Sequence, residues 1–182
     1  MRDRKNLDAE VASAQKPAQR KTRLEAMFDR VLAQCTLIDY AAELVVKIPG
    51  PILEVGLGNG RTYDHLCDRF RGREIFAFDR ELASDPRSRP DKSRFIQGDF
   101  LETLPKALVR IGAKAAVAHC DIGSHDSKAS RTLGAVVARL LAPLVAHQGV
   151  VLGDQPMVHP DFEALPLPGN LEPESYFIYR VR

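Results

Sequence analysis

Short apolar runs alternate with helical segments between residues 52 and 154, and this alternation constrains the fold more than any other feature. The apolar runs lie at residues 52–56, 74–79, 94–99, 114–121 and 149–154. Most are apolar at consecutive positions, which is typical of strands that are buried on both faces. Helical periodicity occupies residues 61–70, 101–112 and 127–146, whereas residues 81–93 form a polar loop with room for one helical turn. The pattern predicts an α/β fold with a mostly parallel, twisted sheet and helices on both faces.

The ends of the chain extend this domain, which we predict to span residues 49–182. Residues 1–20 are basic and are expected to form a flexible tail, although a nucleic-acid contact is an alternative. Residues 21–48 are predicted to form a helical extension. Five prolines between residues 156 and 173 leave room for at most a turn or two of helix, so the C-terminal part is abbreviated and ends in a strand at 174–182.

A stripe of apolar and small residues runs along the predicted N-terminal helix. Its members are spaced alternately by four and three positions: Leu24, Phe28, Val31, Cys35, Ile38, Ala42 and Val45. Such spacing places them on one face of a helix. The stripe either packs on its own domain or forms a seam between subunits, which would make the protein a homo-oligomer.

Composition excludes several classes of protein. No apolar run approaches the roughly 20 residues that a membrane helix needs, and the first residues lack the apolar core of a secretory signal. The three cysteines are far apart, which does not favour a disulfide framework or a cysteine-rich zinc site. We therefore expect a cytoplasmic protein without a membrane partner.

Three glycines follow the first apolar run, in the sequence EVGLGNGR at residues 54–61. A dinucleotide-binding fingerprint would need Gly or Ala at the position of Arg61, and a P-loop would need Lys followed by Ser or Thr. Neither pattern is present. What remains is an acidic residue, Glu54, followed by Gly56, Gly58 and Gly60 at every second position, a spacing that indicates close approach of a ligand to the backbone.

This pattern resembles motif I of the class I S-adenosylmethionine-dependent methyltransferases. The resemblance implies a Rossmann-like methyltransferase fold and S-adenosyl-L-methionine as cofactor, with Glu54 acting through the methionyl ammonium or a bound water. It also implies that Asp79 binds the ribose, that Asp99 pairs with the adenine amino group and that Phe100 packs on the adenine. From the residues alone, Asp79 could simply end a strand and Asp99 could cap the helix that follows.

Polar residues after the fourth and fifth predicted strands are the candidates for the methyl-acceptor site. Methyl transfer requires mainly that the nucleophile is held in position, with a general base where the nucleophile arrives protonated. We predict Asp121, His125 and Asp154 as catalytic residues. A weaker resemblance, to the metal-dependent O-methyltransferases, implies a Mg²⁺ site at Asp121, Asp154 and Gln155, with Gln where that branch has Asn. Alternatively, these residues end strands and cap a helix.

The predicted function is methyl transfer from S-adenosyl-L-methionine to a small molecule, with oxygen as a candidate acceptor atom. The Asn/Asp-Pro-Pro-aromatic pattern of the amino-methyltransferases is absent, and the chain has no tryptophan or basic-aromatic stripe, so a nucleic-acid substrate is not expected. The N-terminal helix, the loop at 81–93 and residues 156–173 are left to form the substrate pocket. The rival hypotheses are a non-catalytic S-adenosylmethionine-binding module and a nicotinamide-dependent oxidoreductase, which Arg61 disfavours.

Overall fold

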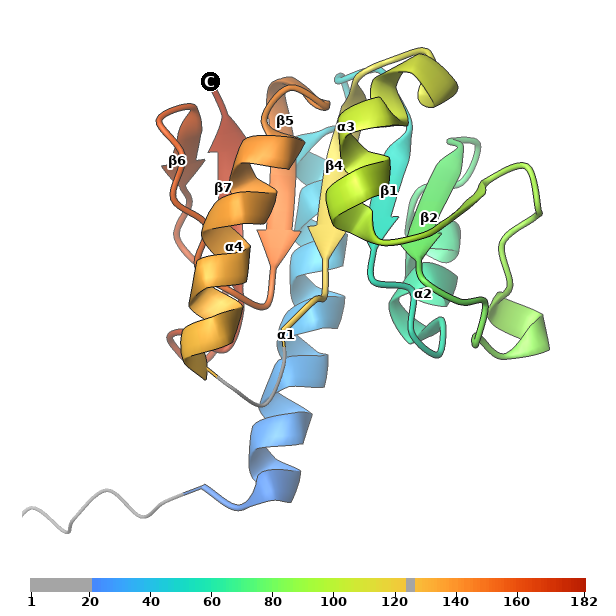
Figure 1. Cartoon of the computed structure of the whole chain (residues 1–182). Coiled ribbons are helices and arrows are strands. Elements are labelled where there is room, and N and C mark those ends of the chain that lie inside the picture. Colours follow the sequence, from blue (N-terminus) through green and yellow to red (C-terminus); the bar gives the residue numbers. More distant parts are fainter. Residues whose placement is uncertain (1–20, 124–126) are drawn as a thin grey trace, which may run out of the picture.

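The structure of the chain, a computed structural model, describes residues 21–123 and 127–182. A seven-stranded sheet with the order β3-β2-β1-β4-β5-β7-β6 forms its centre (Figure 1). The strands are β1 (Ile52–Val55), β2 (Ile75–Asp79), β3 (Phe95–Gln97), β4 (Ala115–Cys120), β5 (Val145–Gly153), β6 (Phe162–Ala164) and β7 (Phe177–Val181).

The first five strands are parallel, and only the C-terminal hairpin breaks this arrangement. Strand β1 pairs in parallel with both β2 and β4, and β7 lies antiparallel between β5 and β6. The strand order therefore reverses between β1 and β4. In open α/β sheets, ligands bind at such a switch point, beyond the carboxyl ends of the strands. The mostly parallel sheet predicted from the sequence is confirmed.

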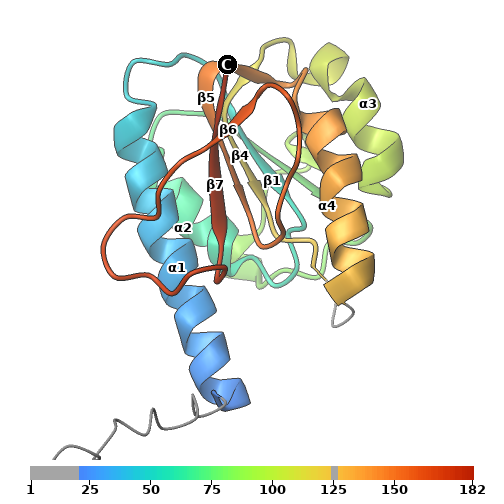
Figure 2. The same cartoon turned by 90° about the vertical axis from the view of Figure 1, so that its left-hand side faces the viewer.

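Two helices cover each face of the sheet (Figure 2). Helices α1 (Arg23–Leu44) and α2 (Arg61–Arg69) pack on one face, and α3 (Phe100–Ile111) and α4 (Ser127–Leu141) on the other. A single 3₁₀ turn, Pro86–Ser88, lies in the loop predicted at 81–93. Within the described residues, no helix is long and apolar enough to span a membrane.

Helix α1 begins at a capping box. The Thr22 hydroxyl accepts a hydrogen bond from the Glu25 amide at 3.2 Å, and the Glu25 carboxylate accepts one from the Thr22 amide at 2.7 Å. The reciprocal pair satisfies backbone donors that a helix start would otherwise leave unpaired. Pro49 and Pro51 follow the end of α1, as the sequence predicts.

The two halves of α1 differ in burial. Leu37, Ile38 and Ala41 are buried against the sheet, whereas Leu24 and Phe28 are exposed. The N-terminal half extends past the carboxyl ends of the strands and has no sheet to pack on (Figure 1). The interpretation that the whole apolar stripe packs on its own domain is therefore wrong for this half.

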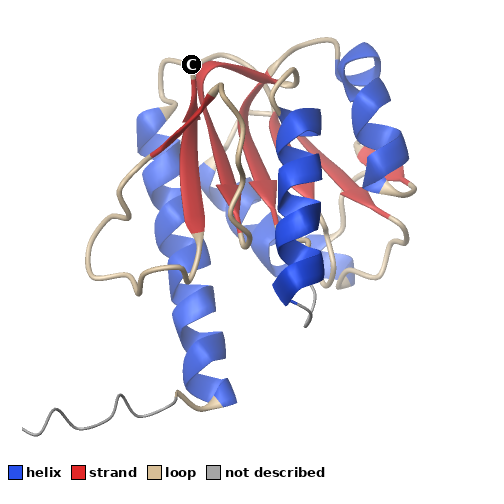
Figure 3. Cartoon of the chain, turned by 60° about the vertical axis from the view of Figure 1, so that its left-hand side comes forward, coloured by secondary structure: helices blue, strands red, loops and turns tan. Residues whose placement is uncertain are grey.

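One other expectation needs correction, and one open question is answered. The helix predicted to reach residue 146 ends at Leu141, because Pro143 cannot continue it, and β5 already begins at Val145. The proline-rich segment contains the strand β6, which the sequence did not indicate. This strand makes the C-terminal strand part of a hairpin at the edge of the sheet (Figure 3).

Candidate active site

The glycine loop, residues 56–60, connects β1 to α2 at the switch point of the sheet. Gly56 has a φ of +92° and Gly58 a φ of +50°, both in the left-handed region that favours glycine. A Cβ atom on Gly56 would clash with the backbone carbonyl of Asp121, the residue that follows β4. A Cβ atom on Gly58 would meet nothing within 4 Å. The loop therefore packs against the turn after β4 at Gly56, and it borders open space at Gly58.

A cavity of about 490 Å³ lies in front of this loop. Loop residues and Asp79 form one side, and Arg61, Thr62 and His65 of α2 continue it. The other side is formed by Asp121 and by one face of α1: Met27, Arg30, Val31, Gln34, Cys35 and Ile38. The volume falls within the range of small-molecule and cofactor sites, about 300–1,000 Å³. The prediction that the N-terminal helix contributes to a pocket agrees with this lining, but the loop at 81–93 and residues 156–173, which were predicted to contribute as well, do not line this cavity.

Asp79 lies at the end of β2, and its carboxylate is fixed by backbone groups. It accepts a hydrogen bond from the amide of Gly58 at 2.8 Å and another from the amide of Arg80 at 2.7 Å. Asp79 also lines the cavity. The structure thus brings together the predicted ribose-binding carboxylate and the glycine loop.

Asp99 and Phe100 lie outside this lining. Asp99 is the N-cap of α3 and accepts a hydrogen bond from the Leu101 amide at 2.9 Å, and it also pairs with Arg80 at 2.6 Å. The Leu101 hydrogen bond, and then Arg80, lower the pKa of the Asp99 carboxyl. Phe100 packs against the core between the sheet and α3. These contacts correspond to the capping alternative that the sequence left open.

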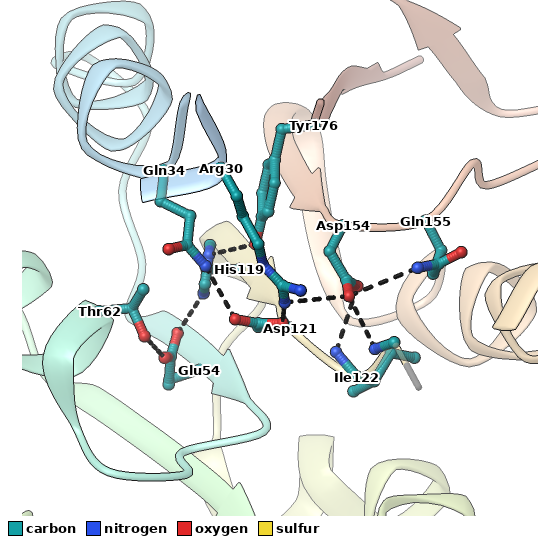
Figure 4. Close-up of polar contacts among 11 residues, drawn as sticks. Arg30, Gln34, Glu54, Thr62, His119, Asp121, Ile122, Asp154, Gln155 and Tyr176 are labelled. Atoms are coloured by element: carbon teal, nitrogen blue, oxygen red, sulfur yellow. Dashed lines mark hydrogen bonds and ion pairs between the residues drawn. The ribbon is translucent and has the colours of Figure 1, made fainter. Parts of the chain in front are cut away.

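Glu54 is fully buried and does not line the cavity. One carboxylate oxygen lies 2.5 Å from Nδ1 of His119, and the other accepts a hydrogen bond from the hydroxyl of Thr62. Nε2 of His119 lies 2.7 Å from the hydroxyl of Tyr176, just before β7 (Figure 4). Glu54, His119 and Tyr176, here called the buried triad, thereby connect β1, β4 and the C-terminal hairpin inside the fold.

Electrostatics in the triad favour a charged histidine. Burial lowers the pKa of His119, but the negative charge of Glu54 and its hydrogen bond outweigh this effect and raise the pKa above its usual value. Burial raises the pKa of the Tyr176 phenol well above its usual value, so that the hydroxyl stays protonated. The contacts of Glu54 in the structure are with His119 and Thr62, and its action through a methionyl ammonium or a bound water stays a prediction.

Asp121 is half-buried and is held by two side chains of α1 (Figure 4). Nη2 of Arg30 forms an ion pair with one carboxylate oxygen, and Nε2 of Gln34 donates to the other at 2.8 Å. Since Arg30 and Gln34 are four residues apart, they lie on the same face of the helix. Asp121 therefore faces the cavity with a fixed orientation.

Asp154, at the end of β5, lies beside Asp121 but is less accessible. Its carboxylate accepts hydrogen bonds from the amides of Ile122 at 3.2 Å and Gly123 at 2.8 Å, and it lies 3.3 Å from Arg30. Burial and then the charge of Asp121 raise the pKa of Asp154, and Arg30 opposes this shift. The predicted pair Asp121 and Asp154 is thus brought together, with an arginine between the two carboxylates.

The residues at this position do not fit the predicted Mg²⁺ site. Arg30 already balances the two carboxylates, and Gln155 directs its amide nitrogen toward Asp154 at 3.5 Å. Within residues 21–123 and 127–182, no group of three His, Cys, Asp or Glu side chains could hold a metal ion. His125, the third predicted catalytic residue, lies outside the described residues.

Sequence reasoning missed Arg30, Gln34 and Tyr176. Arg30 and Gln34 had one usable signal, their four-residue spacing on a helix next to the apolar stripe. No signal in the sequence indicated Tyr176, because the pairing of β7 with β5 is what brings it to His119.

A family model described as S-adenosyl-L-methionine methyltransferase matches residues 21–181 of this chain. The chain belongs to this family. It is an S-adenosyl-L-methionine-dependent methyltransferase with the Rossmann-like fold, as the resemblance implied. The family match does not support the rival hypotheses of a non-catalytic module and of a nicotinamide-dependent oxidoreductase.

Solved structures agree with the family. The structure of S-adenosyl-L-methionine methyl transferase from Silicibacter pomeroyi DSS-3 is 37% identical, and the match covers 90% of this chain and 100% of that chain with a TM-score of 0.86. Human methyltransferase-like protein 13, solved with S-adenosylhomocysteine, is 16% identical over 83% of this chain and 81% of that chain, with a TM-score of 0.54. This second likeness shows the fold alone. No curated protein is significantly similar to the chain.

Proposed function

We propose that this methyltransferase methylates an oxygen atom of a small-molecule acceptor, with Asp121 as the general base. One observation carries the proposal: Asp121 lines the same cavity as the glycine loop, and Arg30 and Gln34 hold its carboxylate there. We call the glycine loop with Asp79 the donor end of the cavity, and Asp121 with Arg30 and Gln34 the acceptor end.

The donor end fits S-adenosyl-L-methionine. Gly58 leaves open space where any other residue would place a side chain, and Asp79 presents a fixed carboxylate that suits a ligand with hydroxyl donors. When bound, the cofactor supplies a methyl group on a sulfonium centre, which is already an activated leaving group. The residues of the chain then have to hold the acceptor in line, an effect that can supply about 7 to 11 kcal/mol.

Asp121 can take the proton that a hydroxyl acceptor must lose. A carboxylate offers about four lone-pair sites, and Arg30 and Gln34 use one on each oxygen. The remaining sites are free to accept the hydroxyl proton as the new O–C bond forms and the bond from the methyl carbon to the sulfonium sulfur breaks. Because both partners of Asp121 lie on α1, the helix sets the direction of the base.

Asp154, beside the acceptor end, and Arg30 have supporting roles in this proposal. Asp154 is nearly inaccessible and holds the amides of Ile122 and Gly123, so we assign it to positioning the turn after β4. Arg30 supplies positive charge where the sequence suggested a metal ion. Activity should therefore be unchanged by a chelator such as EDTA.

The test is Asp121→Asn, with Asp161→Asn on the surface as control. Transfer of labelled methyl groups is measured to 4-methylphenol, benzylamine and phenylacetate, and affinity for S-adenosylhomocysteine is measured by calorimetry. We expect label on the phenol, with kcat lowered about 100- to 10,000-fold in Asp121→Asn and affinity retained. Methylation of the amine or carboxylate alone, or an unchanged kcat in Asp121→Asn, would contradict the proposal.

A further inference from the structure

Exposed apolar side chains gather on the N-terminal half of α1. The large hydrophobic residues that are exposed in the described part of the chain number ten, and five of them lie between residues 24 and 32: Leu24, Met27, Phe28, Val31 and Leu32. Leu24 is 75% exposed and Phe28 66%. Single exposed hydrophobics need no explanation, but a contiguous group marks a surface that binds something.

This surface continues into the cavity. Met27, Val31 and Ile38 line the cavity and lie on one side of the helix, at spacings of four and seven residues. We call them the apolar wall. Their exposed fraction rises from 1% at Ile38 to 52% at Met27. The cavity thus opens toward the N-terminal half of α1, where Leu24 and Phe28 extend the wall into solvent.

The polar acceptor end lies directly beside this wall. Arg30 follows Met27 by three positions and Gln34 follows Val31 by three, so both pairs are neighbours on the helix surface. Arg30 and Gln34 hold Asp121. One helix therefore presents a fixed polar group and an apolar surface side by side to whatever enters the cavity.

We infer that the acceptor is amphiphilic: a small molecule whose reactive hydroxyl reaches Asp121 and whose apolar body lies along the wall of Met27 and Val31. The inference rests on the proposed function, because it names the substrate class of that same site. A ligand that enters from the open side contacts the wall before it reaches Asp121. Burial of its apolar body then removes from water both the ligand surface and the exposed side chains of the helix.

Binding of a homologous series of ligands tests this inference without requiring turnover. The protein is saturated with S-adenosylhomocysteine, and 4-ethylphenol, 4-butylphenol and 4-hexylphenol are titrated by calorimetry. We expect Kd to fall with chain length, by at most about fourfold for each CH₂ group. In Met27→Asn and Val31→Asn, this dependence on chain length should largely disappear.

Leu32→Asn is the matched control. Leu32 is 46% exposed on the same helix but does not line the cavity, so the dependence on chain length should persist in this variant. Because Met27 and Leu32 are similarly exposed, both substitutions leave the core intact, and circular dichroism verifies the fold.

The inference is overturned if no phenol binds, if Kd is independent of chain length, or if Leu32→Asn has the same effect as Met27→Asn. The inference also fails if light scattering shows that Met27→Asn only dissociates a dimer while phenol binding is unchanged, since the wall would then bind a second copy of the chain. A chain-length effect on binding without methyl transfer to the phenolic oxygen would contradict the proposed function but leave the amphiphilic ligand in place.

Discussion

The donor end of the cavity is held together by residues that are close in sequence, whereas the acceptor end joins distant ones. Gly58 and Asp79, which are hydrogen-bonded at the donor end, lie 21 positions apart. At the acceptor end, Arg30 and Gln34 reach Asp121 across 91 and 87 positions, and Arg30 reaches Asp154 across 124. A local pattern can therefore specify the methyl donor, while the proposed recognition of the acceptor would depend on where helix α1 packs.

The buried triad connects strands β1 and β4, from which the donor end and the acceptor end of the cavity extend. Its disruption should have the largest effect on the free energy of unfolding. In Glu54→Leu, His119 and Thr62 lose a buried partner, and removal of one member of a buried ion pair costs about 3–5 kcal/mol. The free energy of unfolding, measured in urea, should fall by that amount.

The control for Glu54 is the exposed ion pair of Glu163 and Arg182, which are 3.3 Å apart. Glu163→Leu should cost less than about 1 kcal/mol. If the two leucine variants are equally stable, the triad does not hold the two ends together.

Gly56→Ala should have the next largest effect, because Gly56 is where the donor end packs against the acceptor end. Its φ of +92° and the clash of a Cβ atom with the Asp121 carbonyl should together cost about 2–4 kcal/mol of unfolding free energy. Gly112→Ala isolates the backbone contribution, since Gly112 has a φ of +77° and open space around it, and it should cost about 1–2 kcal/mol. Equal costs at the two glycines would show that the contact with β4 is unimportant.

A smaller effect is expected from pH, through the ionisation of His119. Glu54, Asp121 and Asp154 carry the negative charges near the ring, and the Tyr176 hydroxyl bonds its Nε2. Because the pKa of His119 is raised above 6.5 in the folded state, its contribution to stability is complete below pH 6.5 and is lost as pH rises through the folded pKa.

Urea unfolding of the wild type and of His119→Gln between pH 6 and pH 9 measures this contribution. The stability difference between the two proteins should shrink as pH rises. A difference that stays constant over this range would mean that folding does not shift the pKa of His119, and a difference that grows with pH would mean that folding lowers it.

The contrast between the two ends also explains what the sequence could predict. The alternation of strands and helices follows from local hydrophobic periodicity, and the positions of Gly56, Gly58 and Asp79 follow from the ends of those strands. The contact of Glu54 with His119 was not predictable, because His119 belongs to a different strand, β4. The strand β6 was not predicted for a similar reason. Its three residues lie between prolines and form a strand only because they pair with β7.

The central claim is that the two ends of the cavity have separate tasks, and paired measurements on Asp79→Ala and Asp121→Asn test it most directly. Asp79→Ala should weaken binding of S-adenosylhomocysteine by about 1.5–3 kcal/mol, the range for hydrogen bonds to a charged group. Asp121→Asn should keep that affinity and lose kcat toward the phenol. If Asp121→Asn weakens binding of S-adenosylhomocysteine as much as Asp79→Ala does, Asp121 belongs to the donor end and the division between the two ends is wrong.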